Sequence, residues 1–288
     1  MANDARVAII GLGYVGLPLA IAFKEAGLAV VGVDASESRV TELRGGMSPI
    51  DDITDDRLRA ALELGLRIAL PADAALAEAD AIFVCVPTPI DAAKDPDLRP
   101  VLAAAELIGG SLRHGQVIVL QSTTFPGTTT GPFREVLERS GMTAGVDFDL
   151  AFAPERVNPG DPASAARQVP RLVGATTPAA TKRVATLLRN INDTVVEVSS
   201  PDVAEFAKIL ENVFRNVNIA LVNQLALLCE RMGVDVWEVI DAAATKPFGF
   251  MRFLPGPGRN GMNPKGFVAA ASITSHTSSP IRSQSSAS

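Results

Sequence analysis

Residues 7–20 read VAIIGLGYVGLPLA, and this stretch decides the fold. The apolar run VAIIG is typical of a buried strand, and it leads directly into Gly11, Gly13 and Gly16. Glycines at these positions allow a tight turn and let the backbone approach a pyrophosphate, while the N-terminus of the following helix favours negative charge. The pattern G-x-G-x-x-G between a strand and a helix therefore predicts a dinucleotide site.

A carboxylate strengthens this prediction and selects the cofactor. The apolar run AVVGVD at 29–34 ends in Asp34, where a carboxylate accepts hydrogen bonds from the adenosine ribose hydroxyls. Its charge repels a 2′-phosphate, so it favours NAD over NADP. Arg39 is either an adenine contact or a solvated helix charge. We expect Tyr14 and Val15, inside the glycine turn, to line the same site.

Strand and helix patterns alternate along the first two thirds of the chain. Apolar runs rich in Val and Ile lie at 7–11, 29–34, 81–86, 117–122, 149–153, 171–173 and 195–198. The alternation predicts an α/β Rossmann-like domain over residues 1–198, with a doubly wound parallel sheet.

The remainder of the chain has a different pattern. Ser200, Pro201 and Asp202 predict a helix start, and the apolar period runs to about Met232. We expect a helical connecting and dimerisation domain over 199–258. Residues 259–288 become rich in Ser and Thr without an apolar period, which predicts a disordered tail.

Composition excludes several classes of protein. The 288 residues are 47% hydrophobic and carry a formal net charge of −6, so no basic surface for nucleic acid is expected. The longest apolar stretch, 213–229, contains one Arg, three Asn and one Gln, too many polar residues for a membrane span of ~20 apolar residues. The N-terminus has no signal-peptide pattern, and we expect a cytoplasmic protein that contacts no membrane.

The glycine turn GLGYVGLP resembles the first loop of the UDP-glucose/GDP-mannose (nucleotide-sugar) 6-dehydrogenase family. Further segments resemble that family in the same order: VCVPTPID (84–91), QSTTFPGTT (121–129), FAPERVNPG (152–160), EFAKILENVFRNVNIALVNQLA (205–226) and FLPGPG (253–258). Two others, AAKDPDL (92–98) and DVWEVIDAAATKPFGF (235–250), are most similar to the branch acting on UDP-N-acetylglucosamine and UDP-N-acetylmannosamine.

The resemblance implies an activity and partners. The family oxidises the sugar C6 alcohol to a carboxylate in two NAD-dependent steps, so it implies a UDP-sugar 6-dehydrogenase that uses NAD. UDP-N-acetylhexosamine is the favoured substrate and UDP-glucose the next. It also implies a homodimer formed through the helix at 202–232, and no metal.

Individual residues receive roles from the same resemblance. Thr88 contacts the cofactor, and Thr123 orients a water and touches the nicotinamide ribose. Glu155 handles the proton of the hydrolytic water. Lys208 and Asn212, spaced i, i+4 on one helix, stabilise the oxyanion that develops at C6.

Each of these residues also has a plainer interpretation. The threonines can be loop hydroxyls with local bonds, and Glu155 can be a surface carboxylate paired with Arg156. Lys208 can be a surface lysine. It shares a stripe of the helix with Asn212, Asn216 and Asn223, and such a polar stripe on an apolar helix requires partners.

The sequence departs from the family after Gly258. The family there carries a glycine-rich segment with its nucleophilic cysteine, then a catalytic aspartate and a C-terminal UDP-binding domain, whereas no cysteine follows Cys229 here. We expect a C-terminally truncated chain that binds NAD and is inactive or impaired in the two-step oxidation. Two alternatives stay open: a non-catalytic NAD-binding and dimerising module, and a 3-hydroxyacid-type dehydrogenase, which shares the Lys and Asn spacing and needs no cysteine.

Overall fold

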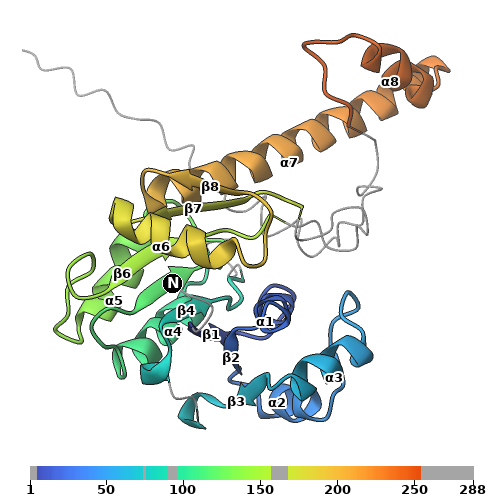
Figure 1. The fold of residues 1–288 in the computed structure, drawn as a ribbon. Coiled ribbons are helices and arrows are strands. Elements are labelled where there is room, and N and C mark those ends of the chain that lie inside the picture. Colours follow the sequence, from blue (N-terminus) through green and yellow to red (C-terminus); the bar gives the residue numbers. More distant parts are fainter. Residues whose placement is uncertain (1–4, 74–75, 90–95, 157–167, 254–288) are drawn as a thin grey trace, which may run out of the picture. The chain divides into compact units, whose positions relative to one another are not determined.

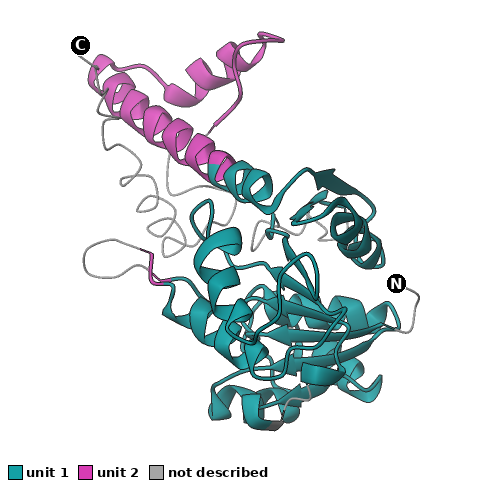
Figure 2. Cartoon of the chain, turned by 90° about the vertical axis from the view of Figure 1, so that its left-hand side faces the viewer, with its two compact units in different colours: residues 1–88, 98–209 teal, residues 89–97, 210–288 magenta. Residues whose placement is uncertain are grey.

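The computed structural model describes residues 5–73, 76–89, 96–156 and 168–253. The chain divides into two compact units, coloured separately in Figure 2. The first comprises residues 1–88 and 98–209, and the second comprises residues 89–97 and 210–288. The tail predicted at 259–288 lies outside the described residues.

The first unit contains an eight-stranded sheet with the order β3-β2-β1-β4-β5-β6-β7-β8 (Figure 1). Its strands are β1 (Arg6–Ile10), β2 (Ala29–Val33), β3 (Arg67–Ala69), β4 (Ala81–Val84), β5 (Val117–Leu120), β6 (Asp149–Phe152), β7 (Arg171–Ala175) and β8 (Val195–Val198). Every neighbouring pair is parallel except β6 and β7, which are antiparallel. The Rossmann-like, doubly wound sheet is therefore confirmed, except that β7 and β8 run opposite to the other six strands, which the sequence pattern did not predict.

Helices connect the strands and continue beyond them. They are α1 (Gly16–Glu25), α2 (Glu37–Arg44), α3 (Asp55–Glu63), α4 (Arg99–Gly109), α5 (Arg134–Glu138), α6 (Pro178–Leu188), α7 (Pro201–Met232) and α8 (Val236–Ala244). Short 3-10 turns lie at Pro71–Asp73 and Leu76–Glu78, and one π-helical turn at Thr129–Phe133. The long helix expected after Ser200 is present and ends at Met232, as its pattern predicted.

The two faces of the sheet bury separate apolar clusters. Alternate residues along β1 show this: Val7 and Ile9 pack with α1, α2, α3 and α6, whereas Ala8 and Ile10 pack with α4 and α5. Strands β1, β4 and β5 have almost no exposed side chains, as expected for parallel strands covered on both faces. This sandwich leaves the carboxyl ends of the parallel strands as the place where a ligand can bind.

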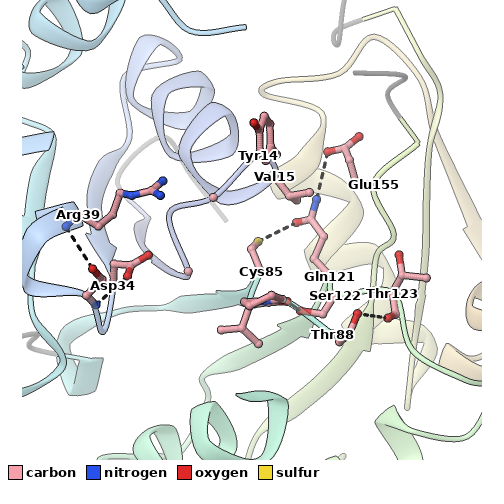
Figure 3. Close-up of a pocket in the computed structure, with 15 residues that line it drawn as sticks. Tyr14, Val15, Asp34, Arg39, Cys85, Thr88, Gln121, Ser122, Thr123 and Glu155 are labelled. Atoms are coloured by element: carbon pink, nitrogen blue, oxygen red, sulfur yellow. Dashed lines mark hydrogen bonds between the residues drawn. The ribbon is translucent and has the colours of Figure 1, made fainter. Parts of the chain in front are cut away.

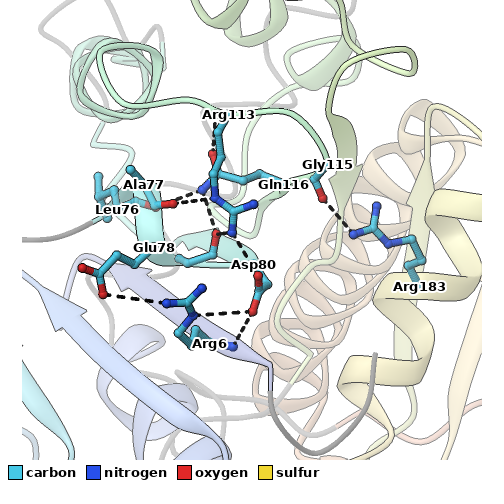
Figure 4. Close-up of polar contacts among 10 residues, drawn as sticks. Arg6, Leu76, Ala77, Glu78, Asp80, Arg113, Gly115, Gln116 and Arg183 are labelled. Atoms are coloured by element: carbon cyan, nitrogen blue, oxygen red, sulfur yellow. Dashed lines mark hydrogen bonds and ion pairs between the residues drawn. The ribbon is translucent and has the colours of Figure 1, made fainter.

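At the opposite end of the strands, a buried amide holds the segment that enters β4 (Figure 4). Gln116 is fully buried, and its Nε2 donates to the carbonyl oxygens of Leu76 and Ala79 at 2.9 and 2.8 Å. Its Oε1 accepts from the backbone N–H of Arg113 at 2.8 Å. The Arg113 side chain adds a 3.0 Å bond to Asp80. Side-chain hydrogen bonds therefore hold the irregular segment that precedes β4.

Replacing that amide by an apolar side chain of similar size tests its contribution. In Gln116→Leu the N–H of Arg113 loses its acceptor, and the carbonyl oxygens of Leu76 and Ala79 each lose one of their two donors. This predicts a decrease of about 1–3 kcal/mol in the free energy of unfolding. Urea titration measures it. The control is Arg139→Gln, which removes an exposed 3.7 Å pair with Glu106 and is expected to change stability by less than ~0.5 kcal/mol. Equal effects of the two changes would contradict a special role for Gln116.

Candidate cofactor and active site

The turn between β1 and α1 is shaped by two glycines that admit no side chain. Gly11 has φ +91°, and a Cβ there would lie 2.7 Å from the carbonyl oxygen of Cys85. A Cβ on Gly16 would lie 1.8 Å from the carbonyl oxygen of Gly11. These contacts bring the N-terminus of α1 close against the ends of β1 and β4.

Gly13 differs from its two neighbours because a Cβ on it would meet nothing within 4 Å. The residue lines a cavity of about 500 Å³, within the usual range for small-molecule sites. Open space above a glycine at a helix N-terminus is what a pyrophosphate needs, so the residues present fit a dinucleotide.

One end of the cavity contains an oriented carboxylate. Asp34 Oδ2 accepts from the backbone N–H of Leu12 at 2.9 Å, and Oδ1 accepts from that of Ser36 at 2.9 Å. Ser36 in turn caps α2 through a 3.3 Å bond from the N–H of Arg39. Asp34 and Arg39 thus lie together beside the glycine turn (Figure 3).

The other end of the cavity is lined by polar residues that follow β4, β5 and β6. Thr88 Oγ1 donates to the carbonyl oxygen of Thr123 at 2.8 Å, which joins the loops after β4 and β5. Beneath them, Gln121 bridges two side chains: Cys85 Sγ donates to its Oε1 at 3.7 Å, and its Nε2 donates to Glu155 Oε2 at 3.3 Å. Figure 3 shows this chain of contacts.

Glu155 is held by a buried cation. Arg171, at the start of β7 and 5% exposed, donates from Nη2 to Glu155 Oε2 at 2.8 Å. The plainer interpretation paired this carboxylate with Arg156, but Arg156 donates to it through its backbone N–H, at 2.8 Å to Oε1. The Arg156 side chain donates to the carbonyl oxygen of Pro170 at 2.8 Å.

Lys208 reaches the same residue from α7. Its Nζ donates to the backbone carbonyl oxygen of Glu155 at 2.5 Å. The structure therefore brings Thr88, Thr123 and Glu155, from three separate segments, to one end of the cavity, and Lys208 contacts the backbone of Glu155. Asn212 follows one turn later on α7 and belongs to the second unit, so its role stays a prediction.

Of the other residues singled out in the sequence, most line the cavity. They are Gly11, Gly13, Tyr14, Val15, Asp34 and Arg39. Gly16 does not line it; it serves the close packing beneath. The roles of all these residues stay predictions. Gln121 and Arg171 were not predicted from the sequence. Only Gln121 had a signal, because it stands two residues before Thr123 in QSTT, at the end of an apolar strand.

Cys85 lines the cavity as a buried side chain. Burial strongly raises the pKa of its thiol, and the negative charge of Glu155 raises it further, against an opposing effect of Arg171. This shift disfavours the thiolate, which is the form of cysteine that acts as a nucleophile.

Among the described residues, no group of three or more His, Cys, Asp or Glu is arranged to hold a metal ion. In the same part of the chain no helix is long and apolar enough to cross a membrane.

A doubly wound sheet, a glycine turn with open space above it and a carboxylate directly after β2 define a dinucleotide-binding domain. The chain belongs to the UDP-glucose/GDP-mannose dehydrogenase family: residues 5–192 match its NAD binding domain and residues 202–274 its central domain. NAD is accordingly the cofactor of the first unit, as the sequence predicted.

Named relatives agree with this assignment. The chain is 40% identical over 256 residues to UDP-N-acetyl-D-glucosamine 6-dehydrogenase of Pseudomonas aeruginosa, covering 88% of this chain and 60% of that protein. It is 35% identical over 243 residues to UDP-N-acetyl-D-mannosamine dehydrogenase of Pyrococcus horikoshii, covering 84% and 58%. The solved structure of the UDP-D-ManNAc dehydrogenase from Pyrococcus horikoshii superimposes with a TM-score of 0.86 at 32% identity, covering 96% of this chain and 65% of that one. The chain thus spans about 60% of the length of its curated relatives.

Adding one methyl group to Gly13 tests the placement of the pyrophosphate. Because a Cβ there meets no protein atom, Gly13→Ala is expected to keep the melting temperature of the wild type. The methyl group occupies the space above the turn, so the affinity for NAD should fall about tenfold or more. Calorimetric titration with NAD measures it.

The control for this change is Gly110→Ala at the end of α4, where a Cβ would make ordinary contacts at 3.7 Å with backbone oxygens. It should leave NAD affinity unchanged. Unaltered NAD binding in Gly13→Ala would place the cofactor elsewhere.

Proposed function

We propose that this chain forms the NAD site and the hydride-transfer site of a nucleotide-sugar 6-dehydrogenase, with a UDP-N-acetylhexosamine as preferred substrate and UDP-glucose next. One observation carries the proposal. A single cavity extends from Asp34 to Thr123 and Glu155, and Lys208 contacts Glu155 at that second end. The substrate class follows the relatives named for UDP-N-acetylglucosamine and UDP-N-acetylmannosamine.

The residues at the second end have the charges that oxidation of an alcohol requires. Bound NAD supplies the hydride acceptor. Lys208 offers a positive charge for the oxygen that becomes an anion as the alcohol is oxidised, and Asn212 shares this task. Glu155 takes up or returns the proton of a water, held in one orientation by Arg171 and Gln121. Thr123 orients that water and, with Thr88, borders the nicotinamide.

The second oxidation requires a nucleophile that holds the aldehyde. Cys85 is the cysteine that lines the cavity, and its thiol is kept protonated by burial and by Glu155. We therefore infer that this chain alone binds NAD and does not complete the oxidation to the uronic acid.

Binding and turnover measured on the same protein test this proposal. Calorimetry with NAD is expected to show binding, and absorbance at the NADH band should show no sustained turnover with UDP-N-acetylglucosamine or UDP-glucose. Any residual NADH formation should fall about 100-fold or more in Lys208→Met and Glu155→Gln, because each removes a charge used in the reaction. Lys182→Met, an exposed lysine of α6, is the matched control.

The other outcomes select the alternatives. Sustained formation of the uronic acid would show that this chain needs no cysteine and would overturn the inferred impairment. Turnover of small 3-hydroxyacids that is lost in Lys208→Met would identify a hydroxyacid dehydrogenase instead. No binding of NAD would remove the basis of the whole proposal.

We also propose that the chain forms a homodimer through α7. Exposed apolar side chains recur along this helix at spacings of four and three residues: Leu210, Phe214, Val217, Leu221, Leu225, Leu228 and Met232. Such spacing places them on one side of the helix, opposite the polar stripe that contains Lys208 and Asn212. A continuous exposed apolar stripe of this length is typical of a helix that packs against another helix.

A charge in the middle of the stripe should prevent the dimer. Leu221→Glu is expected to give monomers in sedimentation velocity at a protein concentration where the wild type is dimeric, because a buried unpaired carboxylate disfavours the interface. Ala220→Glu adds the same charge to an exposed position about 100° around the helix and should leave the dimer intact. A wild type that sediments as a monomer, or a dimer in both variants, would contradict an interface on this stripe.

A further inference from the structure

The polar stripe of α7 begins with a carboxylate that the proposed mechanism does not use. Glu205 is fully buried and lies one turn before Lys208 on the same side of the helix. Burial raises the pKa of this carboxyl group, and hydrogen bonds from Thr129 and Gly127 oppose the rise. A carboxylate in such a position persists only where donors compensate for lost water.

Those donors come from the loop that follows β5, more than 70 residues earlier in the chain. Glu205 Oε2 accepts from the N–H of Gly127 at 2.6 Å, and Oε1 accepts from the N–H of Thr129 at 2.9 Å and from its hydroxyl at 2.6 Å. The same loop contains Thr123. Three bonds to one carboxylate make this the main polar link between the loop and the start of the helix that the described residues show.

The start of α7 is also seated closely on the sheet. A Cβ on Gly174 of β7 would lie 2.0 Å from the carbonyl oxygen of Ser200, so only glycine allows the helix to begin there. Ala204, on the turn that carries Glu205, is fully buried in the cluster formed with α4 and α5. The first turns of α7 therefore cannot shift without breaking the bonds at Glu205.

Beyond Glu205, the next polar contact of the helix is made by Lys208, whose ammonium group reaches the carbonyl oxygen of Glu155 at 2.5 Å. Glu205 thus connects two residues to which the proposed function gives roles. It binds the loop that contains Thr123, and it lies on the helix turn that precedes Lys208.

We propose that Glu205 is a positioning residue: by binding Gly127 and Thr129 it fixes α7 relative to the loop after β5 and so holds Lys208 at Glu155. The effect on catalysis rests on the proposed function, whereas the effect on the position of Lys208 does not. Glu205 itself makes no contact with the cavity, and its influence passes through the helix.

The experiment reads the position of Lys208 directly. Reductive methylation with formaldehyde and a borane, followed by peptide mass spectrometry, gives the labelling rate of each lysine in the folded protein. In Glu205→Gln one acceptor oxygen becomes an NH₂ group facing a backbone N–H, and the labelling rate of Lys208 should rise about fivefold. Lys182, exposed on α6, is the internal reference, and its rate should not change.

Two control variants separate positioning from loss of stability. Asp202→Asn alters the exposed 2.9 Å bond from Thr130 to the same turn of α7 and should leave Lys208 unchanged. Thr129→Val removes one of the three donors and should raise the rate partially, and Thr129→Ser, which keeps the hydroxyl, should restore it. The two Thr129 variants also test the proposal if Glu205→Gln does not fold.

A folded but less stable Glu205→Gln or Thr129→Val protein with unchanged Lys208 labelling would overturn the proposal, because Glu205 would then act on stability alone. A failure of the proposed function would be seen in a different measurement. Increased labelling in Glu205→Gln combined with unaltered NADH formation in Lys208→Met would support positioning by Glu205 while refuting a catalytic role for Lys208.

Discussion

The close backbone contact at Gly11 and Gly16 is the constraint on which the rest of the first unit depends. The N-terminus of α1 lies so near the end of β4 that the carbonyl oxygen of Cys85 occupies the space of a Cβ on Gly11. The same contact sets the height of the glycine turn above the sheet, leaves the space over Gly13 open and brings the N–H of Leu12 to Asp34. Cofactor binding and packing of the first crossover are therefore consequences of one steric requirement.

At the other end of the cavity, an ion pair between Glu155 and Arg171 constrains the structure. Glu155 is largely buried, and Arg171 supplies the opposite charge from a strand that runs against its neighbour β6. A buried ion pair of this kind contributes little net stability, but loss of either partner is costly, so the pair fixes where the carboxylate lies. The negative charge of Glu155 also adds to the effect of burial in raising the pKa of the Cys85 thiol. Glu155 thus influences the ionisation of a cysteine that lines the same cavity.

The sequence predicted the parts of this structure that depend on local patterns. Long apolar runs identified β1, β2, β4, β5 and β6, and the glycine spacing identified the cofactor turn. Strand β3 was missed because its three residues, Arg67–Ala69, are too short to show a period. Strands β7 and β8 were also expected from their apolar runs, but their reversed direction was missed because an apolar run has no signal for direction. Arg171 and Glu205 were missed for a related reason: each lies in a pattern that looks like an ordinary helix or strand, and only their distant partners reveal them.

The sides of helix α7 make different contacts, because its buried and polar residues recur with the helical period. Its first turns must be seated on the sheet, which buries Ala204 and needs glycine at 174. Its polar side carries Glu205 and Lys208, three residues apart, so that one carboxylate can bind the loop after β5 while one ammonium group reaches the loop after β6. Because a helix is stiff over a single turn, the geometry at Glu205 constrains the geometry at Lys208. A buried carboxylate bound to one loop can in this way determine where the ammonium group on the next turn of the helix lies.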